Sequence, residues 1–133
     1  MGKVTNNFPK KTYFCLINLY AMKITIVSGA RPNFMKIAPI TRAIKAAQEA
    51  GKKISYRLIY TGRQDDTSLD ASLFSDLDMK RPDGYLGVTG HDHSEVAAAI
   101  MLAFEKELNN HPAQVVLVVD DLTATMSCSI VAK

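Results

Sequence analysis

Two basic side chains follow a short apolar segment, and their types suit the binding of an anionic group. Residues 24–27 read Ile-Thr-Ile-Val, the pair Ser28-Gly29 comes next, and Arg31 and Lys36 lie shortly beyond. A guanidinium and an ammonium beside a helix N-terminus, with its free backbone N–H groups, can hold phosphate or carboxylate oxygens. Most loop cations are only solvated, so this spacing alone leaves both interpretations open.

Two carboxylates follow a second strand-like segment. Asp120 and Asp121 come directly after the apolar, mostly β-branched run of residues 115–119. A carboxylate in this place can transfer a proton, or it can cap the helix that follows. We favour a cap for Asp120, and both roles stay open for Asp121.

The glycine pattern excludes two common nucleotide sites. The first loop holds the single glycine Gly29, where a dinucleotide-binding turn needs three, and no Gly-Lys-Ser/Thr ending is present. The sequence therefore predicts no NAD site and no P-loop, and no cofactor is expected.

The elements that must position these residues alternate along the chain. Residues 23–27 predict a buried strand, and Ile37, Ile40 and Ile44 fall on one face of a helix that Gly51 ends. Pro39 lies inside this pattern, so either the helix bends there or its regular part begins near Pro39. A second strand is expected at residues 54–60 and a short helix at 71–77.

The second half of the chain repeats the alternation. Residues 81–93 are rich in turn-forming types. Ser94 is the expected N-cap of a helix in which Val96, Ile100, Phe104 and Leu108 recur every fourth residue. A strand is predicted at 114–119 and a further helix from about residue 123.

Strands that alternate with helices predict an α/β fold with a Rossmann-like parallel sheet and flanking helices. Ligands bind such sheets beyond the carboxyl ends of the strands. Three polar loops occupy those ends, at residues 28–36, 61–66 and 120–125. We therefore expect the three loops to lie together and to form the binding site.

Size and composition limit the function further. A chain of 133 residues, 47% of them hydrophobic, can bury one core. The net charge of +3 comes without a basic run, so neither nucleic acid nor an acidic membrane is an expected partner. Cys15 and Cys128 lack metal-site or disulfide spacing, which favours a reducing, cytoplasmic compartment. Residues 1–21 contain an apolar run too short to span a bilayer, and we interpret them as an extension outside the fold.

Other reactive types receive structural interpretations. His91 and His93 lie two residues apart in a turn with no third ligand nearby, so no metal site is predicted. Cys128 lies between Met126 and Ile130 on the last predicted helix and is expected to pack in the core.

The order of the motifs resembles a known family. The segments SGARPNFMKIAPI, TGRQDD and VVLVVDDLTATMSCSIVAK are similar to the amino-terminal part of the non-hydrolysing UDP-N-acetylglucosamine 2-epimerases, and the similarity covers residues 22–133. The Gly-x-Arg-Pro-x-x-x-Lys pattern at residues 29–36 is its most specific part.

The resemblance implies a function and roles for residues. The family interconverts UDP-GlcNAc and UDP-ManNAc, without NAD, in a cleft between two domains of a glycosyltransferase-B-type fold, and it serves cell-envelope polysaccharide synthesis. Arg31 and Lys36 match the family's substrate-binding cations, and Asp121 matches a catalytic carboxylate. Residues 22–133 would then be a truncated N-terminal domain, with a UDP-sugar as partner and a homodimer or a completing second chain as further options.

The sequence also departs from the family pattern. Asp120-Asp121-Leu122 stands where Gly-Asp-Thr is usual, which adds a charge and a Cβ at a turn that favours positive φ. Arg63-Gln64 replaces Gln-His in the second loop, and the family's later glutamates, a histidine and the second domain have no counterpart in these residues. We expect the chain to be inactive alone. A non-catalytic sugar-nucleotide-binding module and a non-functional gene fragment are the alternatives.

Overall fold

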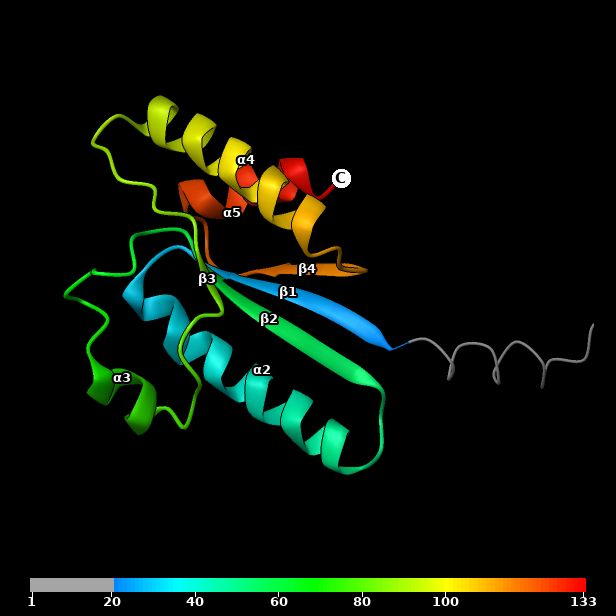
Figure 1. Cartoon of the computed structure of the whole chain (residues 1–133). Helices are drawn as coiled ribbons and strands as arrows, with labels where there is room; N and C mark the ends of the chain where they lie inside the picture. The colour runs from blue at the N-terminus through cyan, green and yellow to red at the C-terminus, as the bar shows by residue number, and fades with distance from the viewer. Residues whose placement is uncertain (1–20) are drawn as a thin grey trace, which may run out of the picture.

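The computed structural model describes residues 21–133, which form a parallel sheet between two layers of helices (Figure 1). The strands are β1 (Met22–Ser28), β2 (Ile54–Tyr60), β3 (Gly84–Tyr85) and β4 (Val115–Val118), in the spatial order β3-β2-β1-β4. The helices are α2 (Arg31–Glu49), α3 (Ala71–Asp76), α4 (His93–Asn110) and α5 (Thr123–Val131). The predicted Rossmann-like α/β fold is confirmed. The predicted extension lies outside the described residues, except for Ala21.

Strand β1 is central because it pairs with β2 on one side and β4 on the other. The register places Ser28 opposite Tyr60 and Val27 opposite Val118. The carboxyl ends of three strands therefore meet at one edge of the sheet, as the sequence predicted. Only β3, two residues long, was missed.

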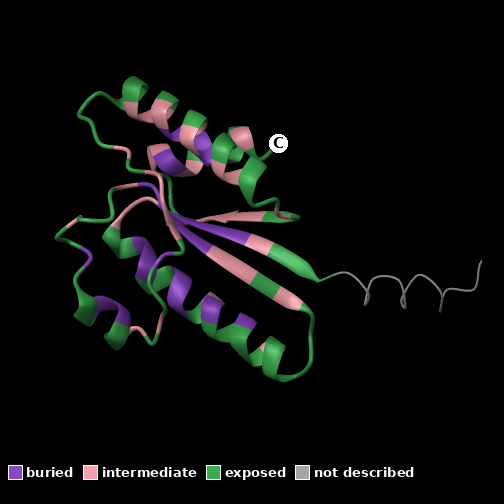
Figure 2. Cartoon of the chain, in the orientation of Figure 1, coloured by how far each residue is buried: buried purple, intermediate pink, exposed green. Residues whose placement is uncertain are grey.

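Alternate strand residues face opposite layers, and each face has its own core (Figure 2). Ile26 and Leu58 pack toward α2 and α3, where the Phe34 ring lies 5.2 Å from the Phe74 ring between centroids. Val27 packs on the other face, with Phe104 of α4 and Cys128 of α5. Each large apolar side chain buried in this way contributes about 1.5–3 kcal/mol. The core position predicted for Cys128 is confirmed, and its burial raises the pKa of the thiol to about 12.

Helix α2 is regular from Arg31, so the alternative in which it begins near Pro39 is wrong. Ile37 and Ala38 before that position and Ile44 after it are buried, whereas Pro39 is exposed. The N–H that proline lacks would have bonded the carbonyl of Met35, which is also an exposed residue. Packing of the buried face therefore holds the helix through the proline.

Helix α4 begins two residues earlier than predicted, and the N-cap assigned to Ser94 is wrong. Asp92 is the N-cap, and its carboxylate accepts a hydrogen bond of 2.8 Å from the backbone N–H of Ser94. A carboxylate at this position also interacts favourably with the helix dipole.

Within residues 21–133, no helix has both the length and the apolar character that crossing a bilayer requires.

Candidate functional site

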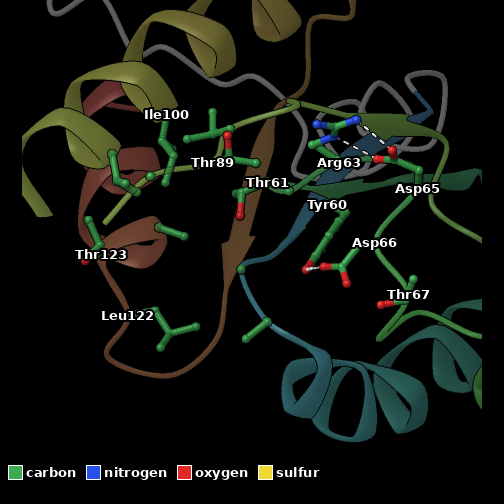
Figure 3. Close-up of a pocket in the computed structure, with 17 residues that line it drawn as sticks. Tyr60, Thr61, Arg63, Asp65, Asp66, Thr67, Thr89, Ile100, Leu122 and Thr123 are labelled. Carbon is green, nitrogen blue, oxygen red and sulfur yellow. Dashed lines mark hydrogen bonds and ion pairs between the residues drawn. The ribbon is translucent and has the colours of Figure 1, made fainter. Parts of the chain in front are cut away.

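An open cleft of about 580 Å³ lies at the carboxyl edge of the sheet (Figure 3). The three loops that the sequence placed together all contribute to its walls, along with the segment before α4. The lining residues used below are Gly29, Ala30, Tyr60, Thr61, Arg63, Asp65, Asp66, Thr89, Val96, Ile100, Leu122, Thr123 and Ala124. One wall is polar and comes largely from residues 61–67, and the opposite wall is largely apolar and comes from α4 and α5.

The first loop is held in shape by a buried asparagine. Asn33 is 1% exposed, and its Oδ1 accepts hydrogen bonds from the backbone N–H groups of Gly29, at 2.8 Å, and Ala30, at 3.1 Å. A Cβ on Gly29 would lie 2.7 Å from the Cβ of Ala124. The close approach of β1 to α5 therefore requires glycine at this position. Sequence inspection gave Asn33 no role, although its place three residues after the N-cap is typical of side chains that bond back to the loop.

The two cations predicted for substrate binding lie beside the cleft, and among the described residues neither is part of its lining. Arg31 is the first residue of α2, directly after Ala30. Its guanidinium lies 4.0 Å from the Asp70 carboxylate, and about half of each side chain is exposed. Lys36, five residues further along α2, forms an ion pair with Asp120. The substrate-binding role of both residues stays a prediction.

The two carboxylates after β4 have different surroundings. Asp120 adopts φ +66°, which confirms the expected turn with positive φ, and its carboxylate binds Lys36 and Asn33. Asp121 is exposed, and its side chain makes no hydrogen bond or ion pair with the described residues. Leu122 is the N-cap of α5, without a side-chain cap bond. The cap roles considered for Asp120 and Asp121 are therefore wrong, and the catalytic role of Asp121 stays a prediction.

The second loop supplies the polar wall of the cleft. Arg63 donates two hydrogen bonds to Asp65, at 2.8 and 2.6 Å (Figure 3). Tyr60 donates a bond of 2.6 Å to Asp66. Burial and this bond raise the pKa of the Tyr60 hydroxyl, and the bond from Tyr60, with those from Ser68, lowers the pKa of Asp66. The sequence indicated a polar loop after β2 but gave no signal for these pairings.

The first turn of α5 adds backbone donors to the opposite wall. Thr123 and Ala124 line the cleft and are the first two residues of the helix, where N–H groups lack partners within the helix. Such groups can hold an anionic oxygen, and the neighbouring Leu122, Val96 and Ile100 offer an apolar surface. The cleft can therefore accept a ligand with both a charged part and a less polar part.

Metal ligation has no support from the geometry. No group of three or more His, Cys, Asp or Glu side chains with the spacing for a metal ion occurs within residues 21–133. His91 and His93 are both exposed near the start of α4.

Comparison with known sequences identifies relatives. A sequence model described as UDP-N-acetylglucosamine 2-epimerase matches residues 45–133. The UDP-N-acetylglucosamine 2-epimerase of Methanocaldococcus jannaschii is 27% identical over 112 residues, which cover 84% of this chain and 29% of that protein. The UDP-2,3-diacetamido-2,3-dideoxy-D-glucuronate 2-epimerase of Pseudomonas aeruginosa is also 27% identical, over 84% of this chain and 30% of that protein.

Solved structures of UDP-GlcNAc 2-epimerases also match this chain. The M. jannaschii enzyme in complex with UDP-GlcNAc and UDP matches with a TM-score of 0.72 and 27% identity, over 84% of this chain and 29% of that chain. The UDP-GlcNAc 2-epimerase from Neisseria meningitidis bound to UDP-GlcNAc matches with a TM-score of 0.71 and 25% identity, over 84% and 29% of the two chains. This chain therefore spans less than a third of the length of the relatives that it matches.

Proposed function

This chain belongs to the UDP-N-acetylglucosamine 2-epimerase family, and we propose that it supplies the amino-terminal half of a UDP-sugar site. The observation that carries the proposal is the cleft at the carboxyl edge of the sheet, where the first loop, the second loop and the first turn of α5 meet. Backbone donors there suit a diphosphate, and Thr61 and Thr89 suit hydroxyl and amide groups of a sugar.

The reaction proposed for the complete site is epimerisation at C2 of the sugar, between UDP-GlcNAc and UDP-ManNAc. A base removes the C2 proton, and the bond between C1 and the diphosphate oxygen breaks with its electron pair leaving on UDP. UDP then adds back to the unsaturated sugar, and a proton returns to the opposite face of C2. Since negative charge develops on the departing diphosphate, nearby cations stabilise the transition state.

Roles follow for three residues under this proposal. Arg31 and Lys36 hold the diphosphate, and Asp121 takes part in proton transfer at the sugar. Proton removal on one face and proton return on the other need more than one positioned group. We therefore propose that the 133-residue chain binds the nucleotide sugar but does not by itself complete the reaction. A homodimer or a second chain is the proposed source of the other groups, and the cytoplasm, where UDP-sugars are made, is the proposed compartment.

A binding test addresses the proposal directly. Titration of the chain with UDP-GlcNAc by calorimetry is expected to show saturable binding, and Arg31→Ala is expected to weaken it about two- to fivefold, the range for one exposed charged contact. Lys45→Ala is the matched control, because it removes the same charge from an exposed position further along α2. Absence of saturable binding, or equal effects of the two substitutions, would contradict the proposal.

A second candidate is a non-catalytic module that binds a sugar nucleotide. The ion pair between Lys36 and Asp120 favours it, because that pair neutralises a cation which the reaction would use. The module would bind UDP-GlcNAc as described, and it would remain inactive when the carboxyl-terminal domain of a related enzyme is added. Recovery of epimerisation in such a mixture would exclude it.

A further inference from the structure

Asp120 has an unusual backbone conformation for a residue with a side chain. Its φ of +66° lies in the left-handed region, which glycine adopts freely and other residues seldom adopt. Aspartate is among the side chains best tolerated there, because its short polar group can bond locally.

Both carboxylate oxygens of Asp120 are engaged by residues of α2. Lys36 Nζ binds Oδ1, and Asn33 Nδ2 donates to Oδ2. The Asp120 side chain is 21% exposed, while that of Lys36 is 61% exposed. Asp120 thus already supplies Lys36 with an anionic partner.

The same contacts connect two loops. Asn33 Oδ1 accepts hydrogen bonds from the backbone N–H groups of Gly29 and Ala30, and Asn33 Nδ2 donates a hydrogen bond to Asp120. The loop after β4 is in this way joined to the loop after β1. A change at Asp120 therefore acts on the first loop through defined bonds, as well as through charge.

The other cations near the cleft are paired as well. Arg31 lies 4.0 Å from Asp70, and Arg63 is bonded to Asp65. Those two pairs are between exposed side chains, so water and salt weaken them. The Lys36 pair differs because its carboxylate is largely covered and is held by a second donor, which makes it harder to separate.

We propose that Asp120 is a specificity-determining residue that neutralises Lys36 and so weakens the binding of diphosphate by the first loop. The inference rests on the proposed function, since it concerns the affinity of the same site for the anionic part of a nucleotide sugar. This chain would then select ligands more by contacts to the nucleoside and sugar than by contacts to the diphosphate.

The test measures pyrophosphate binding by calorimetry at low salt in the full chain. Asp120→Asn keeps the shape and one acceptor oxygen, and asparagine is also tolerated at positive φ. We expect it to bind pyrophosphate about three- to tenfold more tightly than the wild type, because one nearby negative charge is removed. When Lys36→Ala is already present, adding Asp120→Asn is expected to leave the pyrophosphate affinity unchanged.

Glu49→Gln is the charge-matched control, because Glu49 ends α2 about 20 Å of helix away from Lys36. Thermal unfolding of each variant checks that the fold is kept. An affinity of Asp120→Asn equal to or below that of the wild type, a gain that persists without Lys36, or no pyrophosphate binding by either protein would overturn the inference.

Parallel titrations with UDP-GlcNAc separate the two proposals. If the wild type fails to bind UDP-GlcNAc while Asp120→Asn gains pyrophosphate affinity through Lys36, the proposed function fails and the role of Asp120 stands. If UDP-GlcNAc binds and the substitution changes neither affinity, the proposed function stands and the role of Asp120 is rejected.

Discussion

At the scale of single residues, the three cations at and beside the cleft are already paired with carboxylates. Lys36, Arg31 and Arg63 each lie beside an aspartate, and Tyr60 bonds to Asp66. A ligand anion must compete with these carboxylates. Sequence inspection found Arg31 and Lys36 from their spacing, but it could not find the partners, since Lys36 and Asp120 are 84 residues apart. Only the placement of β4 beside β1 brings them together.

The bond from Tyr60 to Asp66 predicts a stability that depends on pH. The folded pKa of Asp66 is lowered, so its contribution is present above the unfolded value of about 4 and is lost as pH falls through the folded pKa. Tyr60→Phe removes the bond and is expected to cost about 1 kcal/mol at pH 7. The loss is expected to shrink in acid, as measured by urea unfolding at pH 7 and below pH 4.

Tyr85→Phe is the control for this prediction, because it makes the same change on the neighbouring ring, 6.3 Å from that of Tyr60 between centroids. A carboxyl NMR titration should also show a higher pKa for Asp66 in Tyr60→Phe. A loss of stability that is equal at both pH values, with an unchanged Asp66 titration, would be the contrary result.

At the scale of elements, hydrophobic spacing predicted all the long strands and helices, and local chemistry decided the errors. The limits of β2 were predicted as observed, because Gly51 ends the preceding helix and Thr61-Gly62 follows the strand. Strand β3 is too short for any periodicity. The start of α2 was uncertain because proline is unfavourable inside a helix, yet the buried neighbours of Pro39 keep the helix intact.

Because Pro39 leaves one backbone hydrogen bond of α2 unmade, we predict that Pro39→Ala stabilises the protein. The alanine N–H can bond the free carbonyl of Met35, and the expected gain is about 1–3 kcal/mol in the free energy of unfolding, measured in urea. Pro32→Ala is the control, since Pro32 is the second residue of the helix, where an N–H has no partner within the helix. A Pro39→Ala protein no more stable than the wild type would show that the helix is adapted to the proline.

The contact between the first loop and α5 gives a second prediction at this scale. Gly29→Ala would place a Cβ 2.7 Å from the Cβ of Ala124, and overpacking of this kind costs about 1–3 kcal/mol. Ala124→Gly alone should cost about 1 kcal/mol through helix propensity. In the double variant the clash is relieved, so the combined loss should be smaller than the sum. Simple additivity in urea unfolding would argue against the close approach.

At the scale of the whole molecule, the fold and the place of the cleft could be predicted from alternating strands and helices. The detailed chemistry could not, because it depends on which loop side chains meet after folding. The cleft is open, and the chain covers 29% of the length of its M. jannaschii relative. The proposed binding of a nucleotide sugar can therefore be tested separately from the proposed catalysis.

The separation predicts the outcome of an exchange experiment. The 133-residue chain, incubated with UDP-GlcNAc in D2O, is expected to incorporate no deuterium at C2, because proton removal and return need groups beyond Asp121. Mass spectrometry of the recovered nucleotide sugar measures the incorporation. A homologous full-length epimerase under the same conditions is the positive control. Enzyme-dependent incorporation by this chain would show that its own residues suffice for proton transfer.

The cleft at the carboxyl edge of the sheet is proposed to bind a nucleotide sugar, and NMR can locate that binding residue by residue. In a titration of the 15N-labelled chain with UDP-GlcNAc, saturable shifts are predicted for the backbone N–H groups of Gly29, Thr61, Thr123 and Ala124, which line the cleft. The N–H groups of Lys23 and Ser55, at the opposite edge of the sheet, should not move. Shifts confined to that opposite edge, or no saturable shifts at all, would show that the cleft is not the binding site.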